Sequence, residues 1–291
     1  MTRTSPGVSR AADLYGGRTI ALLTQHGKER VIAPVLEAAL GCRVERVADY
    51  DTDLLGTFTR DIPRAGTQLG AARTKALLSM ELAGSPLGLA SEGAFGPDPF
   101  TGMLRWNVEM LIWIDSEREL EVVGVAQGSA VFSHLLTADW HAAESFAGNQ
   151  KFPDHHMVVR PDGEGDPRIR KGITSWTELE AAFARALEQS ASGQVFLETD
   201  SRAHANPTRM ENIRLAAEDL ARRLCSLCPA CNAPGFWIME RVAGLPCREC
   251  GSPTRETRAD VHGCLKCPHR STLDRTDRQY ADAVCCDYCN P

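Results

Sequence analysis

Four pairs of cysteines near the end of the chain have the spacing of metal ligands. Each pair is a CxxC turn, and 15, 13 and 18 residues separate successive pairs. Such a turn directs two sulfurs to one ion, and zinc in structural sites takes four ligands in a tetrahedron. The eight cysteines therefore predict two closed, structural zinc sites. The pairs are Cys228 and Cys231, Cys247 and Cys250, Cys264 and Cys267, and Cys286 and Cys289.

The sequence leaves open how the four CxxC turns pair and whether other residues replace a cysteine as ligand. We expect sequential pairing, in which the first and second CxxC turns share one ion and the third and fourth share the other, rather than a cross-braced arrangement. Disulfides or a redox dithiol are the alternatives to zinc. Cys225 and Cys285 remain as spare thiols, and His262 and His269 are possible substitute ligands. The segment has few large apolar residues, so bound metal would supply much of its folding free energy.

A second group of polar residues follows the first apolar stretch, 19–23. Thr24, His26, Gly27 and Lys28 lie between this expected strand and an expected helix. Backbone N–H groups at a helix N-terminus, with a hydroxyl and an ammonium group, suit a phosphate or another anion. The glycine spacing is not that of a Walker motif. A solvated lysine after a turn is the alternative interpretation.

Carboxylates recur where further expected strands end. Asp53 follows the second strand closely, with Asp49 and Asp51 before it. Glu92 follows a short apolar strand around residue 89, and Glu109 interrupts the apolar run 108–114. Carboxylates at the ends of strands in an open α/β sheet are typical of ligand sites, and their hard oxygens suit Mg²⁺. A solvated acidic turn is the alternative for Asp53, and a water-facing strand position is the alternative for Glu109.

Apolar periodicity predicts the elements that position these residues. Strands are expected at 19–23, from 43, at 108–115 and 119–128, and at 194–200. Helices are expected before Gly41, over 67–83, over 175–189 from a capping box, and from Asn206 as N-cap. Residues 148–172 are rich in Gly, Pro and charge, and are expected to form a long surface excursion with one short strand at 157–160. We therefore expect an α/β domain with a mixed sheet over 1–222, followed by a zinc-ribbon module over 223–291.

Three of these segments together resemble the inosine-triphosphate pyrophosphatase superfamily. They are "TQHGKE", "GTQLGAARTKA" and "LASEGAFG", which lie within the part of the resemblance that spans residues 19–125. The resemblance implies that Thr24 and Lys28 bind a triphosphate and that Lys75 lies beside its phosphates. It also implies that Glu92 helps to hold Mg²⁺ and to activate water.

A later turn, "RAHANPTRM", parallels the base-recognition turn of that superfamily. By this resemblance His204 and Arg209 would contact the base. The chain departs from the superfamily pattern at His26, where asparagine is expected, and at Ser91, where a pair of aspartates is expected to begin.

The chain as a whole also resembles an uncharacterised bacterial family, a domain of unknown function. The resemblance rests on "HGKE", "DTDLLGTFTR", "SEGAFGP", "DSRAHANPTRM" and the "PGF…GLPCREC" tail. It brings no established activity.

Charge and composition narrow the possible partners. The net charge is −6, and residues 1–200 carry 19 basic against 27 acidic residues. Such a balance disfavours binding to a nucleic-acid backbone by bulk charge. Neither a secretory signal nor a membrane span is evident, which predicts a soluble, cytoplasmic protein without a membrane partner.

The residues predict a Mg²⁺-dependent nucleoside-triphosphate pyrophosphohydrolase or a related phosphate-handling enzyme, with a nucleotide or another phosphorylated small molecule as ligand. Glu92, Asp53 and Glu109 would hold the ion and orient water, while Lys28 and Lys75 would neutralise phosphate charge. The alternative is a non-catalytic nucleotide-recognising protein whose zinc ribbons bind a protein or RNA.

Overall fold

The computed structural model describes residues 11–48, 50 and 66–291. Two compact units make up this part of the chain. One comprises residues 17–220, and the other comprises residues 221–291 together with residues 11–16. The boundary between them falls within a single long helix, α6 (Pro207–Cys225).

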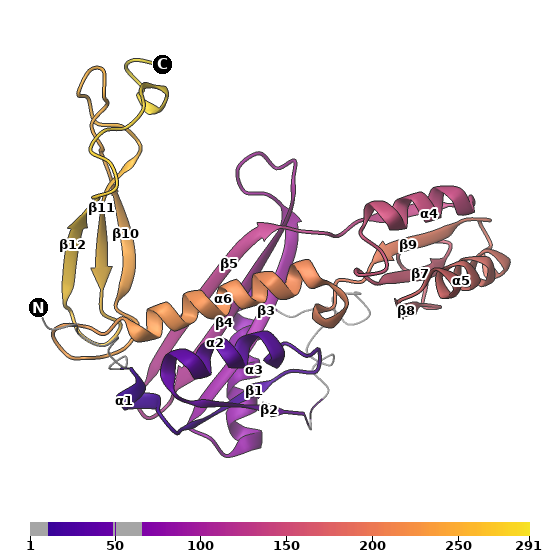
Figure 1. The fold of residues 1–291 in the computed structure, drawn as a ribbon, viewed down its shortest axis with the longest axis horizontal. Helices are drawn as coiled ribbons and strands as arrows, with labels where there is room; N and C mark the ends of the chain where they lie inside the picture. Colours follow the sequence, from indigo (N-terminus) through magenta and orange to yellow (C-terminus); the bar gives the residue numbers. More distant parts are fainter. Residues whose placement is uncertain (1–10, 49, 51–65) are drawn as a thin grey trace, which may run out of the picture. The chain divides into compact units, whose positions relative to one another are not determined.

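A mixed five-stranded sheet forms the first part of unit 17–220 (Figure 1). Its order is β2-β1-β3-β4-β5. Strand β1 pairs in parallel with β2 and β3, whereas β3, β4 and β5 pair antiparallel. The predicted mixed α/β architecture is therefore confirmed. The strands are β1 (Thr19–Leu23), β2 (Arg43–Val47), β3 (Leu87–Pro97), β4 (Arg105–Asp115) and β5 (Leu120–Ser129).

Helix α2 (Glu29–Leu40) connects β1 to β2, and α3 (Gln68–Ala83) precedes β3. The Oγ1 atom of Thr67 accepts a hydrogen bond from the Gly70 N–H and caps the N-terminus of α3. Gly41 and Gly84 end the two helices in the left-handed conformation, as glycine can without strain. Small residues let α3 approach the sheet closely: a Cβ added at Gly88 would lie 2.6 Å from the Ala76 carbonyl oxygen.

Strand β3 is longer than the sequence predicts. The apolar run suggests a short strand around residue 89 that ends before Glu92, but β3 continues to Pro97. Its whole length pairs with β4, so that Glu92 is opposite Met110 and Gly93 is opposite Glu109. Glu92 thus lies within a central strand, and its side chain is buried. The prediction that it follows the strand is wrong, because antiparallel pairing with β4 sustains β3 through its polar residues.

A second sheet lies in the later part of the same unit (Figure 1). Its order is β6-β9-β7-β8, and all pairs are antiparallel. The strands are β6 (His134–Thr137), β7 (Met157–Pro161), β8 (Arg170–Ile173) and β9 (Val195–Thr199), accompanied by helices α4 (Trp140–Asn149) and α5 (Trp176–Gln189).

The short strand expected at 157–160 is confirmed as β7, but the long surface excursion expected around it is wrong. Strand β7 is buried along its full length, and β8 pairs with it. The error arises because the Gly- and Pro-rich stretch 162–169 is only the connection between two strands, while β7 itself is short and apolar.

The other unit contains a three-stranded antiparallel sheet of order β10-β11-β12. Its strands are β10 (Trp237–Ala243), β11 (Thr257–Gly263) and β12 (Arg270–Asp274). Two short helical segments, α1 (Ala12–Tyr15) and η3 (Ala283–Cys285), also belong to it.

In unit 17–220 another short helical segment, η2 (Ala203–Ala205), precedes α6. Helix α6 begins as predicted, because the side chain of Asn206 accepts a hydrogen bond from the Arg209 N–H.

Candidate functional site

The cysteines of the C-terminal unit gather into two groups of four. The ligand atoms of each group lie within 4.8 Å of one another. A tetrahedron with Zn–S bonds of about 2.3 Å has sulfurs about 3.8 Å apart. Four sulfur pairs that join different turns are 3.5 to 3.9 Å apart, which matches that tetrahedron and is far longer than a disulfide bond. Both groups therefore fit zinc.

The pairing of the CxxC turns is interleaved. One group joins the first and third turns, and the other joins the second and fourth, so the expected sequential pairing is wrong. The groups are Cys228, Cys231, Cys264 and Cys267, and Cys247, Cys250, Cys286 and Cys289.

Strand pairing explains this arrangement. Trp237, at the start of β10, is opposite Gly263, at the end of β11, which brings the first turn beside the third. At the other end of the sheet Ala243 pairs with Thr257, and Ala259 pairs with Asp274. The second and fourth turns follow the strand ends there. The antiparallel order of the three strands thus determines which turns share an ion.

The residues around the tetrads are consistent with a metal-stabilised unit. Phe236 and Leu245 are the largest apolar side chains buried after Cys225 among the described residues. Hydrogen bonds from the side chain and backbone of Ser252 lower the pKa of Cys250 to about 6, and the hydrogen bond with Cys250 raises the pKa of Cys289 in the same tetrad to about 12. His262 and His269 lie outside both tetrads, with their rings 5.8 and 5.6 Å from that of Phe236.

Unit 17–220 contains a second candidate site, a buried charged cluster. We use this name for Lys28, Lys75, Glu92, Glu109 and Arg209. They come from five separate elements: the turn before α2, and α3, β3, β4 and α6. The structure brings them together, since Lys28 interacts electrostatically with each of the other four.

Lys28 joins the turn after β1 to strand β3. Its Nζ atom donates a hydrogen bond to the Ser91 carbonyl oxygen at 2.8 Å and lies 3.4 Å from the Ser91 Oγ. Thr24, in the same turn, is buried, and its carbonyl oxygen accepts a hydrogen bond from the Nε of Arg46 at 3.1 Å. Gly27 has φ 69°, which permits the tight turn. Parallel pairing of β1 with β3 places this turn beside the middle of β3.

Lys75 and Glu92 form an ion pair between α3 and β3. The side chain of Glu92 is 2% exposed and that of Lys75 is 13% exposed. Gln68, in the first turn of α3, donates from Nε2 to the backbone oxygens of Glu92 at 2.8 Å and Val108 at 3.0 Å. The N-terminal half of α3 is thus attached to β3 and β4 at the level of the cluster.

Arg209 and Asn107 hold the other carboxylate, Glu109. The Nε of Arg209 donates to Glu109 Oε1 at 2.7 Å, and the Nδ2 of Asn107 donates to the same oxygen at 3.0 Å. Asn212 donates in turn to the Oδ1 of Asn107 at 2.9 Å. Gly93 faces this network and leaves room for it, because a Cβ there would lie 2.7 Å from the Arg209 Nη2.

The charges of the cluster are unequal. Three cationic side chains meet two carboxylates, and the cluster is buried. Burial, followed by the charge of Arg209, lowers the pKa of Lys28 to about 7. Below about pH 7 the cluster therefore carries an excess positive charge, which is costly in a buried site without an anionic partner.

Two histidines from the sequence-predicted site lie side by side. The His26 ring is 5.2 Å from the ring of His204 in η2. The ring of His156 lies 6.4 Å from that of His204. Burial and the nearby Arg202 lower the pKa of His204. The structure therefore brings His204 to the turn that carries Lys28, whereas Arg209 is engaged with Glu109. Asp53 lies outside the described residues.

Some residues of this network were missed from the sequence. Gln68 holds the Glu92 backbone, Asn107 holds the Glu109 carboxylate, and Asn212 holds Asn107 in turn, although none of the three is charged. Asn206, Arg209 and Asn212 recur at intervals of three along α6, so they share one helix face, and this spacing was a usable signal. Asn107 and Glu109 are two residues apart in β4, so they too share one face of their strand.

Comparisons with known proteins identify the family but no activity. No helix among the described residues is long and apolar enough to cross a membrane. Searches of curated proteins and of solved structures gave no match. The family model described as Domain of unknown function (DUF6671) matches residues 75–291, which include Lys75, Glu92, Glu109, Arg209 and both cysteine tetrads. Because this match covers more than half of the chain, the protein belongs to the family Domain of unknown function (DUF6671).

Proposed function

We propose that the buried charged cluster binds the phosphates of a nucleoside triphosphate, and that the protein is a Mg²⁺-dependent pyrophosphohydrolase of the inosine-triphosphate pyrophosphatase type. The observation that carries this proposal is the convergence of Lys28, Lys75, Glu92, Glu109 and Arg209 from five separate elements. Chemistry on phosphoanhydrides needs cations beside the phosphates and carboxylates beside the metal. The cluster offers both within one region.

The excess of positive charge supports a polyphosphate ligand. Lys28 is held with a pKa of about 7 by burial and neighbouring cations. An anionic phosphate beside Nζ would favour its charged form and so gain an ion pair on binding. Lys75 is the more exposed of the two lysines, with 13% of its side chain accessible to solvent. In this proposal both ammonium groups neutralise phosphate charge.

The carboxylates fit a hard metal ion. Among the described residues the Oε2 atom of Glu109 is buried and has no hydrogen-bond partner, which is costly for a carboxylate oxygen. Carboxylate oxygens are the protein ligands that Mg²⁺ takes in phosphate-handling sites. Glu109 and Glu92 would hold the ion, with Asp53 as the candidate outside the described residues. When bound, Mg²⁺ would neutralise phosphate charge and make a bound water more acidic.

The remaining residues would position these groups. Arg209 and Asn107 fix Glu109 through hydrogen bonds to its Oε1, which leaves Oε2 for another partner. Glu92 would orient water once Lys75 exchanges its carboxylate for a phosphate oxygen. His26 lies in the same turn as Lys28, and His204 lies next to His26. Their rings offer faces on which a base would stack.

A second candidate function is recognition without catalysis. It is favoured by one observation: both carboxylates already have cationic partners, Glu92 with Lys75 and Glu109 with Arg209. In this alternative unit 17–220 recognises a nucleotide, and the zinc-ribbon unit binds a protein or RNA. Small zinc ribbons commonly serve such contacts or simply stabilise a chain terminus.

Turnover distinguishes the two functions. The protein would be incubated with Mg²⁺ and a panel of standard and non-standard nucleoside triphosphates, and pyrophosphate release measured. We expect release with at least one triphosphate, and loss of release in Glu92→Gln. Glu121→Gln is the matched control. Glu121 also pairs with a cation of α3, Arg73, but that pair is exposed, whereas the pair of Glu92 with Lys75 is not. Saturable binding without release would support the recognition function, and release unaffected by Glu92→Gln would remove Glu92 from the catalytic site.

A further inference from the structure

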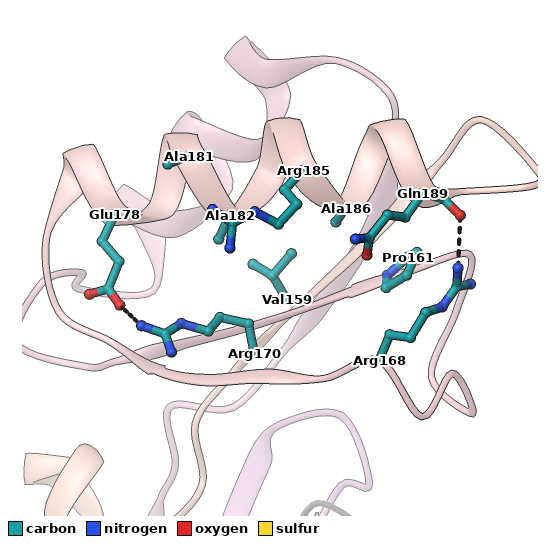
Figure 2. A pocket seen from close by; sticks show the side chains of 10 residues that line it. All are labelled: Val159, Pro161, Arg168, Arg170, Glu178, Ala181, Ala182, Arg185, Ala186 and Gln189. Atoms are coloured by element: carbon teal, nitrogen blue, oxygen red, sulfur yellow. Dashed lines mark hydrogen bonds and ion pairs between the residues drawn. The ribbon is translucent and has the colours of Figure 1, made fainter.

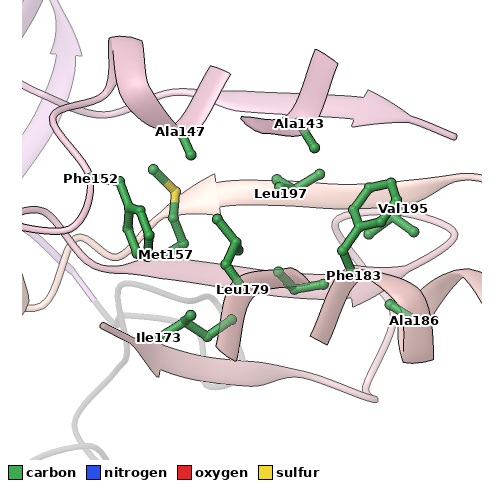
Figure 3. Packing of buried hydrophobic residues seen from close by; sticks show 11 residues of the cluster. Ala143, Ala147, Phe152, Met157, Ile173, Leu179, Phe183, Ala186, Val195 and Leu197 are labelled. Atoms are coloured by element: carbon green, nitrogen blue, oxygen red, sulfur yellow. The ribbon is translucent and has the colours of Figure 1, made fainter. Parts of the chain in front are cut away.

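The second sheet of unit 17–220 has a core of its own. Figure 3 shows the buried side chains of β7 and β9 packed against those of α4 and α5. Phe183 and Leu179 of α5 contribute to it, as do Met157 and Leu197 of the strands. Helix α5 is thus anchored by one face, while another face borders a pocket.

This pocket lies between α5 and strands β7 and β8 (Figure 2), with a volume of about 270 Å³. The pocket shares no lining residue with the buried charged cluster. Val159, Pro161, Ala182 and Ala186 provide an apolar floor and wall, and three arginines surround it: Arg168, Arg170 and Arg185.

Two of the three arginines already have counter-ions. The Nη2 of Arg168 lies 3.1 Å from Asp162 Oδ2, and its Nε donates to Asp166 Oδ1 at 2.9 Å. A further bond from Nη1 to the Gln189 carbonyl oxygen, 2.9 Å long, ties this arginine to the end of α5. Arg170 forms an ion pair with Glu178 across the other end of the pocket. These contacts fix the two ends of the pocket.

Arg185 differs from both. Among the residues that the structure describes, no hydrogen bond or ion pair involves its guanidinium group. Figure 2 shows its side chain reaching from α5 into the space beside Val159. The pocket therefore presents one cation without a counter-ion, next to an apolar surface.

We propose that this pocket binds a small organic carboxylate with an apolar body. The planar guanidinium of Arg185 would take the carboxylate in a bidentate pair, and free donors of Arg170 would lie beside it. The apolar body would cover Val159, Ala182 and Ala186. The volume is just below the roughly 300 Å³ at which small-molecule sites begin, so it suits only a small ligand.

Charge balance favours a single negative charge over the dianion of a phosphomonoester. A monoanion neutralises Arg185 and leaves the other two pairs intact. A second negative charge would meet Glu178, Asp162 and Asp166, which are already committed to Arg170 and Arg168. Because Arg168 and Arg170 already pair with these three carboxylates, a second ligand charge would find no free cation there and would be repelled.

The test uses the full chain and three probes of similar shape: benzoate, its neutral analogue benzamide, and the dianion phenyl phosphate. Binding is followed at constant ionic strength by ¹H–¹⁵N NMR, through the Nε signal of Arg185 and the amide signals of α5. We expect benzoate to shift these signals saturably, and benzamide and phenyl phosphate to bind at least about tenfold more weakly, since an arginine pair to a charged group contributes that much.

Two variants with a matched control locate the site. Arg185→Gln removes the cation, and Ala181→Glu adds a negative charge at the pocket edge. Both should weaken benzoate binding at least about tenfold. Ala184→Glu makes the same change at an exposed position of α5 outside the pocket lining and should leave binding unchanged. Equal binding of benzamide, tighter binding of phenyl phosphate, no binding of benzoate, or equal effects of Ala181→Glu and Ala184→Glu would each overturn the proposal.

Discussion

Arg209 and Glu109 form an ion pair that is closed to solvent, with Nε 2.7 Å from Oε1 and both side chains 0% exposed. They are 100 residues apart in the chain, and their contact joins α6 to β4. This pair connects α6 with the central sheet that carries the charged cluster.

The first prediction concerns the strength of this pair. Arg209→Met leaves Glu109 buried without its cation, so we expect the free energy of unfolding to fall by about 3–5 kcal/mol. The exposed pair of Arg73 and Glu121 provides the comparison, because Arg73→Met should cost less than about 1 kcal/mol. Denaturant unfolding of both variants measures the difference. Equal losses in the two variants would contradict this prediction, because the buried pair would then contribute no more to stability than the exposed pair.

A second prediction tests the space that Gly93 leaves for the network. A Cβ at this position would lie 2.7 Å from the Arg209 Nη2, and the neighbouring groups are held by hydrogen bonds. Gly93→Ala should therefore destabilise the protein by about 1–3 kcal/mol. Gly96 is in the same strand, and a Cβ there meets no atom within 4 Å among the described residues. Thermal unfolding should show little change for Gly96→Ala, and a similar loss in the two variants would contradict the packing described here.

The third prediction follows from the titration of Lys28. Its pKa is lowered from 10.5 to about 7 by burial, so between these values the unfolded chain binds a proton that the folded chain does not. Stability should therefore rise with pH from about 7 to about 10. The rise should amount to several kcal/mol, at about 1.4 kcal/mol per pKa unit, and should be absent in Lys28→Met. Chemical unfolding at several pH values measures it, and the same pH profile in both proteins would contradict this titration.

Zinc content provides the fourth prediction. We expect two zinc ions per chain from the two tetrads. Because the tetrads interleave, Cys231→Ser with Cys264→Ser should remove one ion, whereas Cys231→Ser with Cys250→Ser should remove both. Cys225→Ser is the control and should retain two, since Cys225 belongs to neither tetrad. Native mass spectrometry counts the ions. If the two double variants gave the reverse pattern, the turns would pair sequentially.

Much of the fold could be predicted from local signals. The apolar run of β1, the capping box that begins α5 at Ser175 and the Asn206 cap of α6 all appear in the structure where the sequence places them. These features depend on residues close together in the chain. The choice of these eight cysteines as candidate metal ligands was possible for the same reason, since each CxxC turn is local.

Features that depend on distant strands could not be predicted in this way. The interleaved zinc pairing follows from the antiparallel order of β10, β11 and β12, and their largely polar sequences carry little strand signal. The extension of β3 past Glu92 depends on its pairing with β4. Likewise, the contact of Arg209 with Glu109 depends on how α6 packs, and no local pattern specifies that packing.

Binding of a triphosphate to the charged cluster is the most direct test of this account. Calorimetric titration with a non-hydrolysable nucleoside triphosphate and Mg²⁺ would compare Lys75→Ala with Arg73→Ala, two cations of α3 of which only Lys75 pairs with Glu92. The account predicts that Arg73→Ala binds like the unaltered protein and that Lys75→Ala binds at least about tenfold more weakly. Equal affinity in the two variants would contradict it.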